Sequence, residues 1–178
     1  MSEKSIQLFS TLSNPEEIVL SLLFASCAQA GTKQAFEFGR KVWSEISPLH
    51  RKNEYILTAA LNMFIVSGDL SNAENLFMTM KPNIITYGQM MKCYNNRNMP
   101  KKTIDLYGKM KSQSLQGGSV TFILLADACA QIGIKSLCQS IVSQIPPALS
   151  VDGKLQTTLI HMWVSGVSFF SYFIFIFN

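Results

Sequence analysis

The segment ILLADACAQIG, residues 123–133, is a near copy of SLLFASCAQAG, residues 21–31, and six of the eleven positions are identical. Many residue combinations can fill a single buried helix face, so two unrelated helices are not expected to share so long a segment. A repeated structural unit explains the similarity, because each copy then occupies an equivalent place in the fold. The segment therefore predicts a fold that is built from repeats.

Each copy has the spacing of a helix with one buried stripe, followed by a glycine that ends it. In the second copy the stripe consists of Leu124, Leu125, Ala128, Cys129 and Ile132, and Gly133 follows. In the first copy the same positions are held by Leu22, Leu23, Ser26, Cys27 and Ala30, and Gly31 follows. The pattern predicts two equivalent core helices.

A second type of helix follows the first type. The segments AENLFMTM and TIDLYGKM share one apolar spacing, which is carried by Ala73, Leu76, Phe77 and Met80 and by Thr103, Leu106, Tyr107 and Met110. Polar turns separate the two helix types, SGDLSN at 67–72 and NNRNMP at 95–100, where Pro100 suits a first helical turn. Each unit is therefore predicted to be helix, turn, helix.

The period of the units identifies the architecture. The residue one turn before the end of each first helix is Cys27, Phe64, Tyr94, Cys129 and Trp163, with spacings of 37, 30, 35 and 34. Helical hairpins with such a period stack into α-solenoids, in which each hairpin buries its open face against its neighbours. We therefore expect an all-α fold, a right-handed α-solenoid of helix-turn-helix hairpins with a tetratricopeptide-like superhelix.

Composition and charge narrow the range of possible functions. Apolar residues make up 48% of the 178 residues and charged residues 15%, which indicates a folded chain. The net charge is +4, and the segment from Lys81 to Lys111 carries seven basic residues against Asp105 alone. Such a cluster is either a solvated helix face or a surface that contacts phosphates.

Catalytic and metal-binding patterns are missing from the sequence. Its four cysteines form no Cys-x-x-Cys pair, and neither His50 nor His161 completes a zinc spacing. The sequence also has no glycine-rich phosphate loop and no HExxH or GxSxG motif. We therefore expect no enzyme activity, no metal, no cofactor and no small-molecule substrate.

The segment PNIITYGQMMKCYNNRNMPKKTIDLYGKMKS at 82–112 resembles the pentatricopeptide repeat. Units of that family open with Pro-Asp or Pro-Asn, two aliphatic residues and Thr-Tyr, and their second helix ends in Phe or Tyr followed by Met. Thr86-Tyr87 and Thr121-Phe122 repeat the opening 35 residues apart. The resemblance covers residues 17–166 and implies a module that binds organellar single-stranded RNA sequence-selectively, often to direct its editing, modification or processing.

The resemblance also implies unit boundaries. The expected units are 17–53, 54–83, 84–118, 119–152 and a partial unit 153–166, after an N-terminal extension at 1–16. Their order of long, short, standard, long and short is similar to the branch of the family that mixes these variants. The zinc-binding deaminase-like module of that branch would need a His-x-Glu and a Cys-x-x-Cys, which the sequence lacks.

In this family the fifth and last residues of each unit read a base, about one base per hairpin. By resemblance, the reading pairs are Ser21 with Asn53, Thr58 with Asn83, Gly88 with Gly118, and Ile123 with Asp152. Thr58 with Asn83 is similar to the adenine-reading combination, and Ser21 with Asn53 is close to it. The glycine pair and Ile123 offer no polar side chain for base reading.

The second residue of each unit is aliphatic in the family and packs against a base, although ordinary helix packing would also explain an apolar residue there. These residues are Ile18, Tyr55, Ile85 and Val120. Candidates for phosphate contact are Lys92, Arg97, Lys101 and Lys102. The expected partners are single-stranded RNA and a protein of RNA processing or editing.

The two ends of the chain fit the resemblance less well. The apolar tail, residues 167–178, is open to two interpretations, a membrane anchor or sequence that is not genuinely coding, and we favour the second, which implies no membrane partner. The family implies a mitochondrion or plastid, although the N-terminus is not of presequence type. The alternative function is a tetratricopeptide-type scaffold for a protein partner, attached to a membrane if the tail is an anchor.

Overall fold

The computed structural model describes residues 17–166 as a chain of α-helices. Their bounds are α2 (Glu17–Ala30), α3 (Lys33–Glu45), α4 (Glu54–Val66), α5 (Leu70–Thr79), α6 (Ile84–Asn96), α7 (Pro100–Ser112), α8 (Ser119–Ile132), α9 (Lys135–Val142) and α10 (Gly153–Gly166). The expected N-terminal extension and the apolar tail lie outside these residues. Within them, no helix combines the length and the apolar character that crossing a membrane requires.

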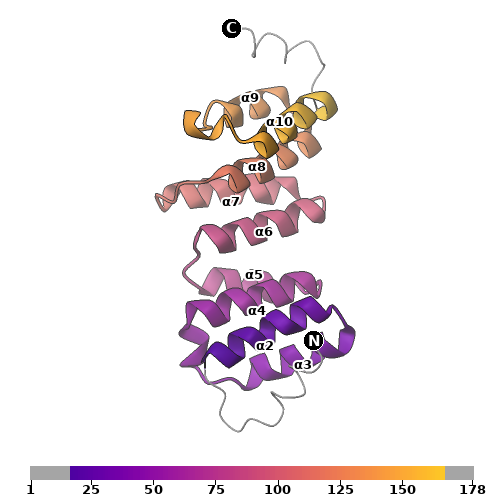
Figure 1. Cartoon of the computed structure of the whole chain (residues 1–178), viewed down its shortest axis with the longest axis vertical. Helices are drawn as coiled ribbons and strands as arrows, with labels where there is room; N and C mark the ends of the chain where they lie inside the picture. Colours follow the sequence, from indigo (N-terminus) through magenta and orange to yellow (C-terminus); the bar gives the residue numbers. More distant parts are fainter. Residues whose placement is uncertain (1–16, 167–178) are drawn as a thin grey trace. The chain divides into compact units, whose positions relative to one another are not determined.

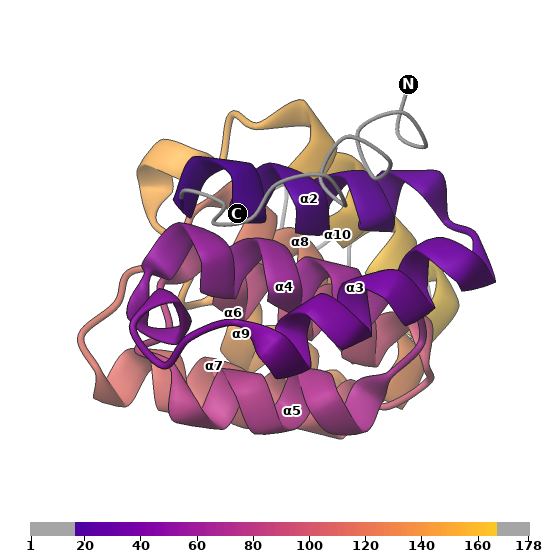
Figure 2. The ribbon, with the colours of Figure 1, turned by 90° about the horizontal axis from the view of Figure 1, so that it is seen from below.

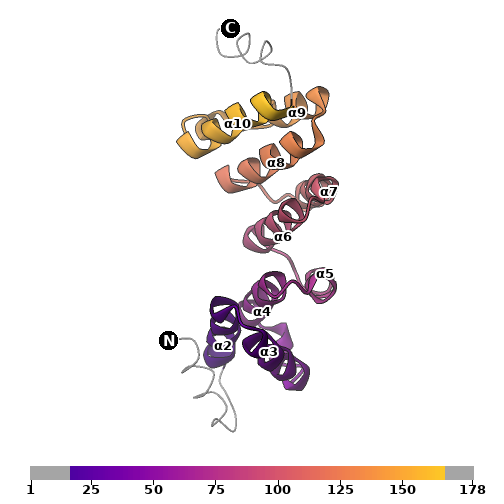
Figure 3. The ribbon, with the colours of Figure 1, turned by 90° about the vertical axis from the view of Figure 1, so that its right-hand side faces the viewer.

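The helices pair into hairpins within two compact units, and the division between the units falls between Pro82 and Asn83. In the first unit α2 lies against α4, and α3 and α5 each pack on the helix that precedes them (Figures 1 and 2). In the second unit α8 lies between α6 and α10, while α7 packs on α6 and α8, and α9 packs on α8 (Figure 3). Within each unit, the first helices of the hairpins therefore form one layer and the second helices another.

Local signals in the sequence explain where the helices begin and end. Asn53 and Asn83 are the N-caps of α4 and α6, and their side-chain oxygens accept backbone N–H groups that would otherwise lack partners. Gly133 ends α8 with a left-handed φ of 72°, and its N–H donates to the carbonyl of Cys129 at 2.9 Å. Gly31 has a φ of 64° after α2, so both copies of the repeated phrase stop as predicted.

The core consists of the predicted stripes. The five residues at the spaced landmark positions are 0–6% exposed, and they are Cys27, Phe64, Tyr94, Cys129 and Trp163. The predicted faces of α5 and α7 are also buried. In the first unit the ring of Trp43 lies edge-on to Phe24 at 5.9 Å and to Phe64 at 6.0 Å, which joins three helices.

Two details of the prediction are wrong. Leu22 is 61% exposed, whereas its counterpart Leu124 is 8% exposed. The reason is that α8 has a helix on each side, α6 and α10, whereas the described residues place a first helix on one side of α2 alone. The predicted turns are also too long, since Asn95 and Asn96 belong to α6 and α5 already begins at Leu70.

Candidate functional site

The second residue of four first helices is apolar and faces solvent. Ile18, Tyr55, Ile85 and Val120 are 69%, 80%, 65% and 66% exposed. The fourth residue of each of these helices is buried, because it falls on the opposite side of the helical turn and reaches the core. Packing between helices therefore does not account for these four side chains, and each of these four hairpins presents one apolar group at the start of its first helix.

The fifth residues lie one turn further along the same face and are half-buried. The hydroxyl of Ser21 donates to the carbonyl of Ile18 at 2.8 Å, so its oxygen lone pairs remain free to accept. No described residue hydrogen-bonds the hydroxyl of Thr58, which remains available as donor and acceptor. Gly88 leaves open space, since nothing lies within 4 Å of a Cβ built there, and Ile123 offers an apolar surface.

The last residues of the expected units lie at the N-termini of the next first helices. The Oδ1 of Asn53 accepts from the backbone N–H groups of Tyr55 and Ile56 at 2.9 and 3.3 Å. Asn83 forms a capping box with Thr86, in which each side chain accepts the backbone N–H of the other residue at 3.0 and 2.9 Å. The capping bonds use the amide oxygens of the two asparagines, so their NH₂ groups take no part in capping.

Gly118 occupies the same place before α8 and provides no side-chain cap. Gly88 and Gly118 therefore bring no side-chain hydrogen-bonding group to their hairpin. The pair of Thr58 and Asn83 is divided between the two compact units, with Thr58 in the first and Asn83 in the second.

In the first hairpin the first residue contacts the last residue through side chains. The Nδ2 of Asn53 donates to the Glu17 carboxylate, 36 residues away in the sequence. In the fourth hairpin the Ser119 side chain lies near the Asp152 carboxylate. The pKa of Asp152 is lowered, first by the backbone N–H of Leu155 and then by the Ser119 hydroxyl, because both groups favour the ionised form.

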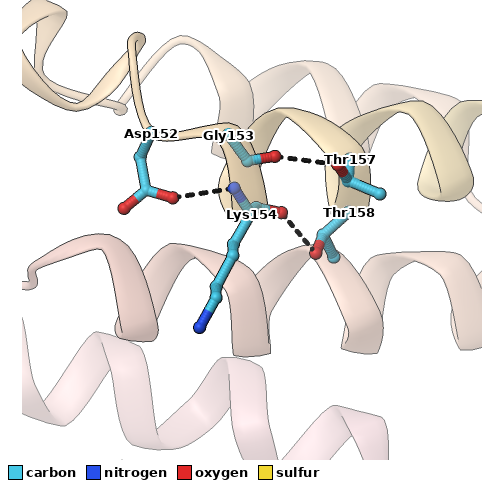
Figure 4. A pocket seen from close by; sticks show the side chains of 5 residues that line it. All are labelled: Asp152, Gly153, Lys154, Thr157 and Thr158. Atoms are coloured by element: carbon cyan, nitrogen blue, oxygen red, sulfur yellow. Dashed lines mark hydrogen bonds between the residues drawn. The ribbon is translucent and has the colours of Figure 1, made fainter.

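The start of α10 shows the same positions in the fifth hairpin (Figure 4). Asp152 accepts the backbone N–H of Lys154 at 3.0 Å, and the hydroxyl of Thr157 donates to the carbonyl of Gly153 at 2.8 Å. These residues line an open depression together with Thr158. Here the second residue is Lys154 and the fifth is Thr157, so this hairpin has a cation where the other four have an apolar group.

Polar groups continue along the first helices of the second unit. Lys92, Asp127 and His161 are each the ninth residue of their helix, on α6, α8 and α10. Asp127 and His161 line a cavity of about 330 Å³, together with polar side chains that include Asn96 and Gln131. Burial raises the pKa of the Asp127 carboxyl, and the charge of His161 partly offsets this rise.

The other basic candidates lie elsewhere on the hairpin. Lys92 is exposed on α6, one turn beyond Gly88 on the face that also carries Ile85. Lys101 and Lys102 are exposed on the first turn of α7, a second helix, and the Lys102 ammonium lies 5.1 Å from the centre of the Tyr94 ring. Arg97 is the half-buried C-cap of α6. Lys92 alone of these candidates shares a helix face with the predicted reading residues.

Several polar residues of this face were missed by the sequence analysis. They are Glu17, Asp127, Lys154, Thr157 and His161. The repeat register could have identified Lys154 and Thr157, which are the second and fifth residues of the fifth hairpin. No local sequence pattern predicts the contact of Glu17 with Asn53, because this contact depends on how α2 and α4 pack.

In residues 17–166 no group of three or more His, Cys, Asp or Glu side chains is arranged to hold a metal ion.

The fold matches solved structures of an α-solenoid class. The structure of the pentatricopeptide repeat protein PPR10 in complex with an 18-nucleotide psaJ RNA element superposes with a TM-score of 0.65 and 14% sequence identity, over 88% of this chain and 24% of that one. The chain is thus an all-α solenoid of helical hairpins. A scan against protein-family models finds no match.

Sequence comparison gives the same family. Pentatricopeptide repeat-containing protein At3g21470 of Arabidopsis thaliana is 28% identical over 123 residues, 67% of this chain and 23% of that protein. The mitochondrial protein At2g35030 of the same name and organism is 29% identical, over 65% of this chain and 18% of its own length. The chloroplastic At3g22150 is 23% identical, over 67% of this chain and 14% of its own length. The sequence is therefore similar to pentatricopeptide repeat proteins, whose fold the structure shares, and the chain spans less than a quarter of these relatives.

Proposed function

We propose that the chain is a sequence-selective module for binding single-stranded RNA, and that it serves RNA processing, modification or editing in an organelle. The observation that carries the proposal is the set of four exposed apolar side chains Ile18, Tyr55, Ile85 and Val120. Exposed aromatic and aliphatic groups provide platforms for unstacked bases, which occur in single-stranded RNA. Their recurrence in four successive hairpins matches a ligand that has one base per repeat.

Base selection in this proposal comes from the fifth and last residues. Ser21 with Asn53, and Thr58 with Asn83, carry hydroxyl and amide groups that can hydrogen-bond a base edge. Gly88 with Gly118 has no such group, and Ile123 with Asp152 has one polar partner. We therefore propose that selectivity comes from the first two hairpins, while the third accepts any base.

The cellular setting is proposed by analogy. Two of the similar Arabidopsis proteins are named mitochondrial and chloroplastic, which supports a mitochondrion or plastid for this chain. The order of long, short and standard units supports the branch of the family that mixes them. An RNA-processing or editing protein is then the expected protein partner, and the residues that carry the proposal bind RNA and perform no catalytic step.

Binding of RNA tests the proposal directly. The full chain is titrated into fluorescently labelled single-stranded RNA of randomised sequence, and the dissociation constant is measured at several KCl concentrations. We expect the logarithm of affinity to fall linearly with the logarithm of salt, with a slope of about −0.7 for each phosphate neutralised. Absence of binding at low salt contradicts the proposal. Salt-insensitive capture of a peptide by the same face would instead support the protein-scaffold alternative.

A further inference from the structure

The reading pair of the first hairpin has a third polar group beside it. Asn53 uses its Oδ1 to cap α4, where it accepts the N–H groups of Tyr55 and Ile56. Its Nδ2 donates to the carboxylate of Glu17, the first residue of α2. Glu17 is itself exposed, so the carboxylate is held at the reading position and is open to a ligand.

We propose that Glu17 is an additional base-reading residue of the first hairpin, and that its carboxylate makes this hairpin prefer guanine to adenine. The inference rests on the proposed function, because it concerns the same RNA-binding face. It goes beyond the expected pair of Ser21 with Asn53, which by itself is close to an adenine-reading combination. The new element is a side chain from outside the pair that changes the hydrogen-bonding character of the site.

The hydrogen-bonding groups of the site explain the preference. One N–H of the Asn53 amide is engaged by Glu17, and the Ser21 hydroxyl hydrogen is engaged by the carbonyl of Ile18. The site therefore retains a single amide donor and gains the acceptor oxygens of Glu17 and Ser21. Guanine carries N–H donors on its pairing edge at N1 and N2, whereas adenine carries an acceptor at N1. An ionised carboxylate accepts from the first and repels the lone pair of the second.

The fourth hairpin brings the same two positions near each other. Ser119, the first residue of α8, lies near the carboxylate of Asp152, the last residue of the same unit, and helps to lower the pKa of that carboxyl. Asp152 accepts the backbone N–H of Leu155 at the start of α10 at 3.0 Å. In both hairpins the start of a first helix therefore lies beside the residue that caps the next first helix.

The apolar surroundings suit this role. Ile18 follows Glu17 and is 69% exposed, and Tyr55 follows the Asn53 cap by two residues and is 80% exposed. A base that reaches Glu17 and Asn53 therefore has apolar side chains from both α2 and α4 beside it. Burial of the base against these groups removes water from the carboxylate and strengthens its hydrogen bonds.

The test compares the full chain with the Glu17→Ala and Glu17→Gln variants on one pool of short single-stranded RNAs of randomised sequence. Bound RNA is recovered at fixed salt and sequenced. For Glu17→Ala we expect the ratio of guanine to adenine to fall about tenfold at a single position of the bound motif. Glu17→Gln retains an oxygen that can accept from Asn53 but loses the charge, so we expect the ratio of guanine to adenine to fall less than in Glu17→Ala. The Glu45→Gln control removes a carboxylate from α3 that is also exposed, and it leaves the ratio of guanine to adenine unchanged.

A second measurement separates the inference from the proposed function. The side-chain NH₂ signals of Asn53 are recorded by NMR in the free wild type and in free Glu17→Ala. In the wild type we expect one of the two NH₂ hydrogens to be shifted downfield and to exchange more slowly with water, because it is hydrogen-bonded to Glu17, and in Glu17→Ala we expect this difference to be lost. If RNA binds but the base ratio is the same at every position in all variants, the inference is overturned and the proposed function stands. If no variant binds RNA, both are overturned. Asn53 NH₂ signals that are the same in the wild type and in Glu17→Ala also overturn the inference, whatever the RNA result.

Discussion

The Thr103 hydroxyl donates a hydrogen bond of 2.6 Å to the side-chain oxygen of Asn95 in the interior of the second unit. The Asn95 amide in turn donates to the carbonyl of Leu124 at 2.7 Å, so one buried side chain links α6, α7 and α8. Asn95 is 6% exposed and Thr103 is fully buried. A polar network of this kind stabilises one arrangement of the helices because any other arrangement leaves its groups unpaired.

Thr103→Val should therefore destabilise the chain, although valine has nearly the same shape. The substitution leaves the Oδ1 of Asn95 buried without its donor, at a cost of about 1–3 kcal/mol. Urea unfolding measures the loss as a lower midpoint with an unchanged slope. Asn96→Ala is the matched control, since Asn96 is the exposed neighbour on the same helix. Equal stability of Thr103→Val and wild type would show that the network contributes nothing.

Gly39→Ala should also destabilise the chain, for a steric reason. A Cβ at Gly39 would overlap the Sδ of Met63 and would lie 3.4 Å from the Sγ of Cys27. Met63 is fully buried, so its side chain has to shift within the core to make room for the new Cβ. Overpacking of this type costs about 1–3 kcal/mol.

The control for Gly39 is another helical glycine. Gly108→Ala introduces a Cβ with nothing within 4 Å on α7, and we expect a gain of up to about 1 kcal/mol from helix propensity. Met63→Ala should reduce the cost of Gly39→Ala, which a double-mutant cycle measures by urea unfolding. Independent, additive losses would mean that Met63 is not the obstacle.

The buried thiols predict a loss of stability at alkaline pH. Burial raises the pKa of Cys27 to about 11 and that of Cys129 to about 12, from an ordinary value of 9.0, and the neighbouring Cys138 adds to the rise at Cys129. Above about pH 9 the unfolded chain releases these protons while the folded chain retains them. Stability is therefore full below pH 9 and declines as the pH rises toward the folded-state values of about 11 and 12.

The measurement is the melting temperature from pH 8 to pH 11. The double variant Cys27→Ala with Cys129→Ala should be less stable at pH 8, because it removes buried groups, and should lose less on going to pH 11. Some decline should remain, since burial also raises the pKa of Tyr87 and of Tyr107. An identical decline in wild type and double variant would contradict the assignment to the thiols.

The fold could be predicted from sequence to a large extent because each hairpin repeats the same buried positions. Cys27 and Cys129 share a local pattern of neighbours, and such patterns determine which face of a helix is buried. Leu22 was mispredicted because its exposure depends on a neighbouring helix and not on its own pattern. Asn95 was assigned to a turn because asparagine is common in turns, whereas its buried partners Thr103 and Leu124 compensate for its polarity.

The candidate site was less predictable. The apolar residues Ile18 and Tyr55 could be identified from the repeat register, and their exposure needed the structure. The contact between Glu17 and Asn53 joins residues far apart in the sequence, and side-chain hydrogen bonds of this range have no periodic signal. The sequence therefore identified the residues of the proposed RNA-binding face, and the structure identified which groups on that face remain available to a ligand.

Tyr55 should contribute to RNA affinity without contributing to stability. Its side chain is 80% exposed at the start of α4, so Tyr55→Ala removes a stacking platform and leaves the core intact. Loss of one aromatic platform is expected to weaken binding by about 1–3 kcal/mol. Met78→Ala is the matched control, because Met78 is 79% exposed on α5, which is a second helix. Fluorescence anisotropy with single-stranded RNA measures both variants, and equal affinities would place RNA away from the first helices.

Lys92 should contribute one phosphate contact. Its ammonium is exposed on the face of α6 that carries Ile85, whereas Lys109 is exposed on α7. Lys92→Gln removes one charge and is expected to reduce the magnitude of the salt slope of RNA binding by about 0.7, because one fewer counterion is released. Lys109→Gln changes the net charge by the same amount, so it should leave the slope unchanged if the phosphates follow the first helices. If Lys109→Gln instead reduces the salt slope and Lys92→Gln leaves it unchanged, the RNA backbone contacts the second helices, where Lys101 and Lys102 lie.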